Sequence, residues 1–329
     1  MQKKLVLISP TSQRLVELFG LELCMKYGIS GFMNSINGAW TFLDINVGDF
    51  ITFIYGARAF NLYKVSKKTA IKDAENLPPW EAIKFRETGN TYYFPFRFEL
   101  ELIREFNEPI VRYEFTYVAE NLLLRGGYRK THFQADQTTL QNVSSMGKMT
   151  NRISEKINYP AINEFTPLIA INKEKVKIPH VYKFSEIFLQ SIIKHNLSIK
   201  ENLIKLLASI DFTDLKDVQF EVLSEKALPQ GHVDLLLKEA VPLGTSKQIV
   251  IEVKTNKAAL KDLNQIKSYI DEIGNDCVGG ILIAKDFNKK VINNKGNIKL
   301  VFYDFPEVEK DGCLIEDFIN SLKLTKFSS

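Results

Sequence analysis

Apolar residues follow two different spacings along this chain. In the first part, short β-rich runs are separated by Gly, Asn and Pro, and they predict a small barrel or a strongly curved sheet. Residues 11–30 precede them and predict an amphipathic helix that ends at Gly28. The β-rich runs span residues 40–43, 49–55, 60–65, 92–102 and 111–118.

The second part alternates strand-like and helix-like patterns. Residues 183–210 predict two helices, and residues 256–273 predict a third with an apolar stripe. Strands are expected between and after them, so this part predicts an α/β domain. The expected strands span residues 217–223, 233–237, 249–253, 280–284 and 299–305, and a final helix spans 316–324.

The join between the two parts lies in a polar, Lys-rich stretch. Residues 144–181 contain Pro160, Pro167 and Pro179 and lack a clear apolar period. A chain of 329 residues is long enough for two ordinary domains. We therefore predict an N-terminal domain over residues 1–172 and a C-terminal domain over 173–329.

Composition narrows the class of protein only a little. A net charge of +4 permits nucleic-acid binding without requiring it. Cys24, Cys277 and Cys313 have no CxxC spacing, so neither a zinc site nor a disulfide framework is indicated. No apolar stretch is long enough to cross a membrane. We expect a soluble, cytoplasmic protein.

Acidic groups stand where a buried strand would favour apolar ones. Side chains alternate along a strand, so Glu252 and Lys254 share one face. Asp234 joins them if it lies at the same height on the neighbouring strand. Two carboxylates beside a lysine suit Mg²⁺ bound to a phosphate, which predicts Asp234 and Glu252 as metal ligands. The alternative is a solvated strand-end ion pair, which arises often by chance.

The order of these motifs resembles a known nuclease group. GHVDLLL, IVIEVK and QIKSY, at residues 231–237, 249–254 and 265–269, resemble the PD-(D/E)xK nuclease superfamily, with the nearest likeness to its NucS/EndoMS mismatch endonucleases. The likeness covers residues 184–305 and implies a restriction-endonuclease-like α/β fold. The Pro that usually precedes the first Asp is absent, since His232 and Val233 stand there.

The resemblance also implies roles for individual residues. Asp234, Glu252 and Lys254 would form the catalytic triad, with Mg²⁺ as cofactor. Gln265 and Tyr269 would line the cleft, and Glu186 is the best match to a further glutamate on the helix before the core.

Aromatic residues are dense in the first part, and their order resembles a second family. GFMNSINGAWTF, VGDFITFIYGARAFNLYKVSKKTAI, Trp80 and YYFPFRFEL resemble the EVE/YTH branch of the PUA-like fold. That resemblance implies a curved β-barrel with flanking helices and a pocket for one flipped base. The candidate cage residues are Trp40 and Trp80, and the candidate base-edge readers are Asn34, Ser35 and Tyr55. For any single aromatic residue, core packing is the alternative.

A basic, glycine-hinged loop follows this region. Arg125, Arg129 and Lys130 flank Gly126 and Gly127, and such a loop suits contacts with DNA phosphates. An ordinary solvated turn is the alternative.

These features together predict a Mg²⁺-dependent endonuclease that acts on double-stranded DNA. A base reader joined to a nuclease favours a modification-dependent restriction enzyme that acts as a homodimer. Three alternatives remain open: restriction of an unmodified sequence, cleavage at mismatches, and a non-catalytic nucleic-acid-binding protein.

Overall fold

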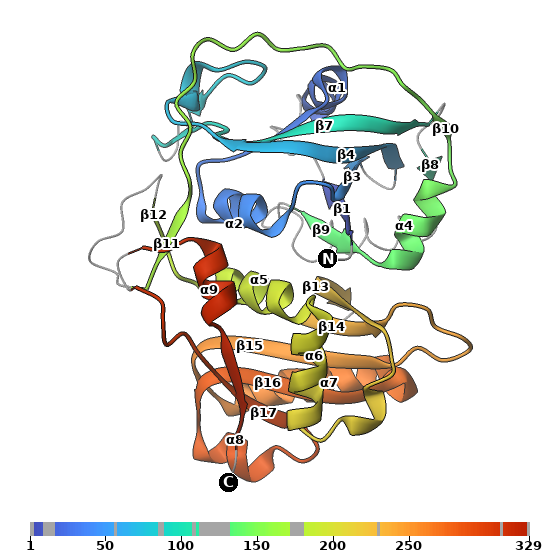
Figure 1. Cartoon of the computed structure of the whole chain (residues 1–329), viewed down its shortest axis with the longest axis vertical. Helices are drawn as coiled ribbons and strands as arrows, with labels where there is room; N and C mark the ends of the chain where they lie inside the picture. The colour runs from blue at the N-terminus through green and yellow to red at the C-terminus, as the bar shows by residue number, and fades with distance from the viewer. Residues whose placement is uncertain are drawn as a thin grey trace.

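Two lobes, each built on one large β-sheet, form this protein (Figure 1). The computed structural model describes residues 3–8, 17–55, 58–84, 89–106, 110–111, 132–171, 181–228, 231–309 and 312–327. The N-terminal lobe carries a curled sheet, and the C-terminal lobe is an α/β layer structure. No helix in these ranges is both long and apolar enough to cross a membrane.

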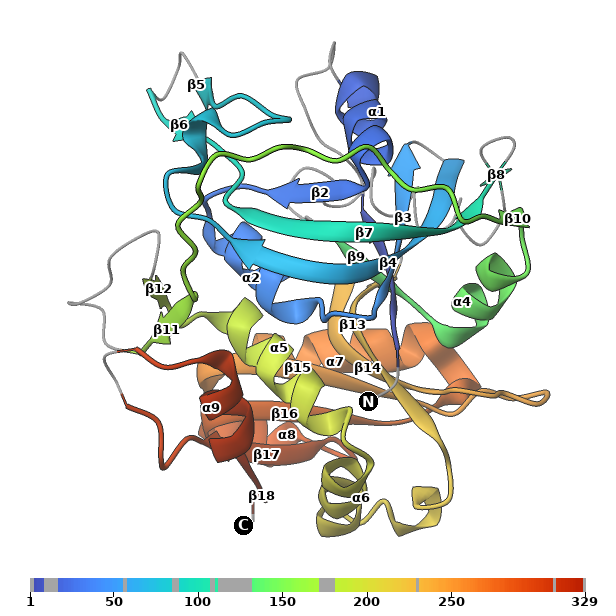
Figure 2. The same cartoon turned by 45° about the horizontal axis from the view of Figure 1, so that its top comes forward.

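The N-terminal sheet is built around two long antiparallel strands, β4 (Arg58–Ala70) and β7 (Phe96–Glu105). Its strand order is β10-β7-β4-β3-β1-β9, with β2 also paired to β7 and β8 to β4. Helices α1 and α2 pack beside it, and α4 follows β9 (Figure 2). The remaining elements are β1 (Leu5–Ile8), α1 (Glu17–Tyr27), β2 (Ile29–Phe32), α2 (Ile36–Asp44), β3 (Phe50–Tyr55), β8 (Ile110–Val111), β9 (Phe133–Ala135), α4 (Gln137–Ser144) and β10 (Lys148–Met149). A separate pair, β5 (Ile83–Lys84) and β6 (Thr91–Tyr92), lies outside this sheet.

One predicted strand of this lobe is wrong. Residues 40–43 lie in helix α2, which begins after Ser35, whose hydroxyl accepts a hydrogen bond from the Gly38 N–H. The β propensity of Trp40 and Phe42 is overridden because the helix buries both rings in the core between α2 and the sheet. By contrast, the predictions of a strand at 49–55 and at 60–65 are confirmed by β3 and β4.

The C-terminal lobe confirms the predicted strand-helix-strand order. Its sheet has the order β13-β14-β15-β16-β17-β18, in which β15, β16 and β17 are parallel and the other pairs are antiparallel. The strands are β13 (Phe220–Leu228), β14 (Gly231–Glu239), β15 (Gln248–Ala258), β16 (Cys277–Phe287), β17 (Lys299–Asp304) and β18 (Lys323–Lys326). The helices are α5 (Glu186–Leu197), α6 (Lys200–Ser209), α7 (Leu260–Ile273), α8 (Lys289–Asn294) and α9 (Ile315–Ser321), with 3-10 turns at Thr213–Leu215 and Gly274–Asp276. A further 3-10 turn at Ala74–Asn76 follows β4 in the N-terminal lobe.

Helix α5 lies between the two lobes and belongs to both cores (Figure 2). Phe188 and Ile192 pack into the core of the N-terminal lobe, whereas Leu189 and Ile193 pack against the sheet of the C-terminal lobe. A helix with apolar groups all round is expected to be buried on all sides. The two lobes are therefore joined through a shared helix as well as through the chain.

A second contact between the lobes is polar. Asp136 forms an ion pair with Lys238 at 2.5 Å, and Glu221 accepts a hydrogen bond of 2.9 Å from the Gln137 N–H. Gln134 on β9 donates to the Val222 carbonyl on β13 at 3.1 Å. These bonds fix the end of β9 and the start of α4 against β13 and β14.

The chain near the predicted domain boundary is tied to the C-terminal region. Strand β11 (Leu168–Ala170) pairs in parallel with β12 (Val181–Lys183), and Ile169 also bridges to Cys313. Asn172 itself lies outside the described residues, so the boundary there stays a prediction.

The buried carboxyl of Glu221 gives the lobe interface a pH dependence. Burial raises the pKa of Glu221 from its ordinary 4.5 to about 7, and the Gln137 N–H only partly opposes this. A carboxyl whose folded pKa lies above its unfolded one stabilises the fold at low pH and loses this contribution as the pH rises toward 7. Between pH 5 and pH 8, the unfolding free energy of the wild type should fall by roughly 2 to 3 kcal/mol more than that of Glu221→Gln. Urea denaturation at both pH values measures it, and parallel pH curves for the variant and wild type would contradict it.

Candidate active site

Asp234 and Glu252 meet where strands β14 and β15 separate. Their ladder pairs Leu235 with Ile251, so the next position of each strand places Asp234 beside Glu252. The Asp234 carboxylate accepts a hydrogen bond of 2.8 Å from the Val253 N–H. The carboxylate thus takes the place of the next ladder bond, and the two strands end their pairing around an acidic notch.

Lys254 gathers three carboxylates around its ammonium group. Its Nζ lies 2.9 Å from a Glu252 oxygen and 3.8 Å from an Asp234 oxygen. Glu186, the first residue of α5, accepts a hydrogen bond of 2.8 Å from the same Nζ. Four predicted residues therefore converge from α5, β14 and β15. We call them the acidic cluster: Glu186, Asp234, Glu252 and Lys254.

The acidic cluster raises the pKa values of three of its side chains. Burial and the neighbouring Glu252 charge raise the pKa of Asp234 well above its usual range, despite the opposing Lys254 charge. Burial raises the pKa of Glu252 to about 7. Burial lowers the Lys254 pKa, but the charges of Asp234 and Glu252 outweigh it, so the pKa rises above its ordinary value. The ammonium stays charged, while the two buried acids resist ionisation without a further cation.

Gln265 and Tyr269 lie one turn apart on α7, as predicted, but Tyr269 is buried. The Gln265 amide donates to the Tyr269 hydroxyl at 3.0 Å, and that hydroxyl donates to the His232 carbonyl at 2.9 Å. A Cβ on Gly231 would come within 2.7 Å of the same hydroxyl. Tyr269 therefore fixes the start of β14, two residues from Asp234, and does not project freely into the cleft.

One carboxylate oxygen of the cluster is suited to a cation. Glu252 is 1 % exposed, and its Oε2 is buried without a hydrogen-bond partner among the described residues, although Oε1 contacts Lys254. An unpaired buried carboxylate oxygen is costly unless a proton or a metal ion compensates it. No group of three or more His, Cys, Asp or Glu side chains is arranged as a metal cage within the described residues. Asp234 and Glu252 fit an ion that takes its other ligands from water and phosphate, as Mg²⁺ does.

The structure contradicts the prediction that Trp40 stacks on a flipped base. Trp40 is 2 % exposed, and its indole Nε1 donates a hydrogen bond of 2.9 Å to Ser191 on α5. Its ring also lies 4.3 Å from that of His132. Trp40 is thus part of the contact between the lobes, and no face of its ring is open to a base.

The other predicted reader residues lie apart from Trp40. Trp80 is half-buried and packs over Gly31, beside the Arg97 guanidinium at 5.6 Å from its ring centre. Asn34 is bound to main-chain groups, since it accepts from the Tyr93 N–H and donates to the Thr91 carbonyl. Ser35 caps α2, and Tyr55 ends β3 half-buried. Arg125, Arg129 and Lys130 lie outside the described residues.

A buried contact between polar side chains at the centre of the molecule was not predicted from the sequence. Asp44 contacts both His132 and Lys194 between the lobes, and each of the three residues is at most 3 % exposed. A local signal was the presence of polar residues, among them Ser191 and Lys194, between the apolar residues of helix α5.

Comparison with known proteins finds a family match within the C-terminal lobe. Residues 203–310 match the family described as Endonuclease NucS C-terminal domain. No curated protein matches the chain. A repair endonuclease from Pyrococcus abyssi is 22 % identical over 28 % of this chain, which covers 44 % of that chain, with a TM-score of 0.21.

Two further solved structures align over most of this chain. An EndoMS–dsDNA2 complex is 15 % identical over 92 % of this chain and 96 % of its own, with a TM-score of 0.21. The DNA modification-dependent restriction endonuclease AspBHI is 11 % identical over 90 % of this chain and 75 % of its own, with a TM-score of 0.20. Asp234, Glu252 and Lys254 all lie in the segment that matches the Endonuclease NucS C-terminal domain, and this part of the C-terminal lobe is therefore similar to that endonuclease domain.

Proposed function

We propose that this chain is a Mg²⁺-dependent DNA endonuclease, with a DNA-reading domain over residues 1–172 and a nuclease domain over 173–329. The observation that carries the proposal is the acidic cluster, in which Lys254 lies within 3.8 Å of Asp234, Glu252 and Glu186. Three acids and one lysine at the point where two strands separate are unusual for a purely structural ion pair. They suit hydrolysis of a phosphodiester.

The residues of the acidic cluster have different proposed roles in hydrolysis. Asp234 and Glu252 would hold Mg²⁺, which when bound supplies Lewis-acid stabilisation of phosphate charge and a more acidic water. The Lys254 ammonium, held by Glu186 and Glu252, is placed to stabilise negative charge that develops on the phosphate oxygens. Tyr269 and Gln265 keep the start of β14 in position, and hence Asp234.

The N-terminal lobe is proposed to read a modified base in double-stranded DNA. The curled sheet and the half-buried Trp80 support this reading, together with the basic loop at Arg125, Arg129 and Lys130. One nuclease site cuts one strand, so double-strand cleavage calls for two copies of the chain, most simply a homodimer.

A panel of duplexes tests the proposed function. Methylated, hydroxymethylated, unmodified and mismatched duplexes of one sequence are incubated with the protein and Mg²⁺, and with Ca²⁺ as the control. We expect cleavage of a modified duplex with Mg²⁺ and binding without turnover with Ca²⁺, whose looser coordination positions a water poorly. Preferred cleavage of the unmodified or mismatched duplex would replace the proposed substrate. Binding without any cleavage would favour a non-catalytic DNA-binding protein.

Trp80 gives a direct test of the reader. If its half-buried ring stacks on a base, Trp80→Ala should cost about 1 to 3 kcal/mol of binding to the preferred duplex and little of non-specific binding. Trp80→Phe, which keeps a smaller ring, should retain part of the preference. Fluorescence anisotropy with modified and unmodified duplexes measures both, and unchanged discrimination in a folded Trp80→Ala protein would refute the role.

Arg125 should behave differently. If it contacts a phosphate, Arg125→Ala should weaken binding to every duplex alike and make the salt dependence shallower by about one counterion. Dissociation constants measured over a range of salt concentrations give the slope. An unchanged slope would assign the loop to an ordinary solvated turn.

A further inference from the structure

We propose that Asp44 and Lys194 are positioning residues for cleavage, which fix helix α5 between the lobes and so hold Glu186 against Lys254. This inference rests on the proposed endonuclease activity and goes beyond it. It assigns a catalytic consequence to a contact far from the acidic cluster, in a helix that precedes the segment matching the nuclease family.

Helix α5 carries both contacts on one rigid element. Glu186 is its first residue and bonds Lys254 at 2.8 Å. Lys194 follows eight residues later, which corresponds to about 12 Å along a helix axis. A displacement of the helix at Lys194 therefore moves Glu186 relative to β15.

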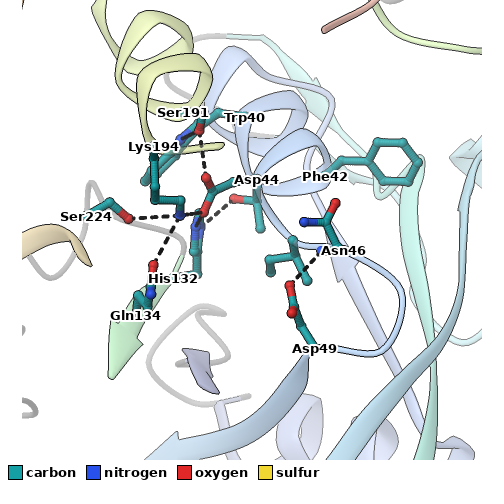
Figure 3. A network of polar contacts seen from close by, with 12 residues as sticks. Trp40, Phe42, Asp44, Asn46, Asp49, His132, Gln134, Ser191, Lys194 and Ser224 are labelled. Atoms are coloured by element: carbon teal, nitrogen blue, oxygen red, sulfur yellow. Dashed lines mark hydrogen bonds and ion pairs between the residues drawn. The ribbon is translucent and has the colours of Figure 1, made fainter. Parts of the chain in front are cut away.

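The N-terminal lobe holds this helix through Asp44, the last residue of α2 (Figure 3). One Asp44 oxygen accepts a hydrogen bond of 2.8 Å from Ser191, and the other contacts the Lys194 ammonium. His132 contacts that second oxygen at 3.0 Å. The Asp44 carboxylate thus binds two side chains of α5 and one that precedes β9.

Lys194 extends the contact to both sheets. Its ammonium donates to Gln134 on β9 at 3.3 Å and to Ser224 on β13 at 3.1 Å. These two acceptors and the Asp44 carboxylate lie in different directions from one nitrogen (Figure 3). The side chain therefore fixes the position of α5 relative to α2, β9 and β13 together.

The Asp44 carboxylate keeps its charge although it is buried. Burial alone would raise the pKa of Asp44, but the Lys194 and His132 groups hold it well below its usual range. A buried ion pair whose remaining hydrogen bonds are made adds directional constraint rather than much net stability. The constraint acts between the lobe proposed to read DNA and the helix that touches the catalytic lysine.

The test uses the full chain with both charges removed. Asp44→Asn/Lys194→Met keeps side chains of similar size and keeps a group that accepts from Ser191. We expect its single-turnover cleavage rate at saturating DNA to fall about ten- to a hundredfold, as for a small misplacement of a catalytic group. Its affinity for DNA with Ca²⁺ should not change. In a Glu186→Gln background the same double substitution should cause no further loss.

The matched control is Asp136→Asn, which breaks an ion pair across the same interface to Lys238 on β14 but touches no residue of α5. It should leave the cleavage rate unchanged. An unchanged rate in the double variant, an equal loss in the control, or losses that multiply with Glu186→Gln would each overturn the inference. Should the double variant fail to fold, Ser191→Ala removes one bond to Asp44 and repeats the test with a smaller loss.

Failure of the proposed function is a separate result. If the wild type cuts none of the duplexes, hydrogen exchange decides whether the contact holds α5. Amides in the first turns of α5 should exchange faster in the double variant than in wild type or in Asp136→Asn. Equal exchange in all three proteins would overturn the inference on its own.

Discussion

Replacing Glu252 by Gln is expected to lower the rate of DNA cleavage by on the order of a thousandfold, while DNA binding is largely kept. The substitution keeps the size of the side chain but removes the negative charge of a carboxylate whose Oε2 is buried and has no hydrogen-bond partner in the described part of the chain. A loss of about 4 kcal/mol in transition-state stabilisation corresponds to this factor, and a site that holds a divalent cation supplies several kcal/mol. Single-turnover rates with Mg²⁺ measure the loss.

The same variant separates an effect on catalysis from one on folding. The pKa of Glu252 is raised to about 7 in the folded protein, so at pH 8 the buried charge destabilises the metal-free fold. Glu252→Gln should therefore be at least as stable as wild type at pH 8 in the presence of a chelator. Glu239→Gln, at the far end of β14, is the matched control and should cut at the wild-type rate. Wild-type activity of Glu252→Gln would remove the site assignment.

Replacing Lys194 by Met is expected to cost about 3 to 5 kcal/mol of unfolding free energy, because Asp44 then remains buried without its cation. The Ser191 and His132 hydrogen bonds compensate only part of the carboxylate charge. Asp44→Asn/Lys194→Met removes both charges and should cost much less than the single substitution. Urea denaturation of the three proteins measures the difference.

An exposed ion pair provides the comparison for Lys194. Lys257 and Asp286 lie 2.8 Å apart, but each side chain is more than half exposed. Lys257→Met should therefore cost less than about 1 kcal/mol. A Lys194→Met loss no larger than that of Lys257→Met would contradict the assigned burial of the Asp44 charge.

The meeting of Asp234, Glu252 and Lys254 could be predicted from the sequence because all three lie in strands, whose side chains alternate between two faces. The spacing of Glu252 and Lys254 fixes their common face, and one antiparallel turn brings Asp234 to the same level. Other features depend on tertiary packing, and the local sequence pattern did not predict them. Trp40 lies in a run of β-forming residues, yet helix α2 buries it against Ser191, which is 151 positions away. The ion pair of Asp44 and Lys194 likewise joins residues 150 positions apart.

The shared helix α5 limits how far the two lobes can be exchanged as independent modules. Phe188 and Ile192 fill the core of the N-terminal lobe, although they belong to the helix that also covers the sheet of the C-terminal lobe. A chimera that joins the C-terminal lobe to a different N-terminal lobe would expose these apolar groups and leave Lys194 without an acid, unless the new lobe supplied a matching surface. If the N-terminal lobe reads DNA as proposed, transplanting its specificity calls for a graft confined to the surface around Trp80, with α2, β9 and α5 kept together as one unit.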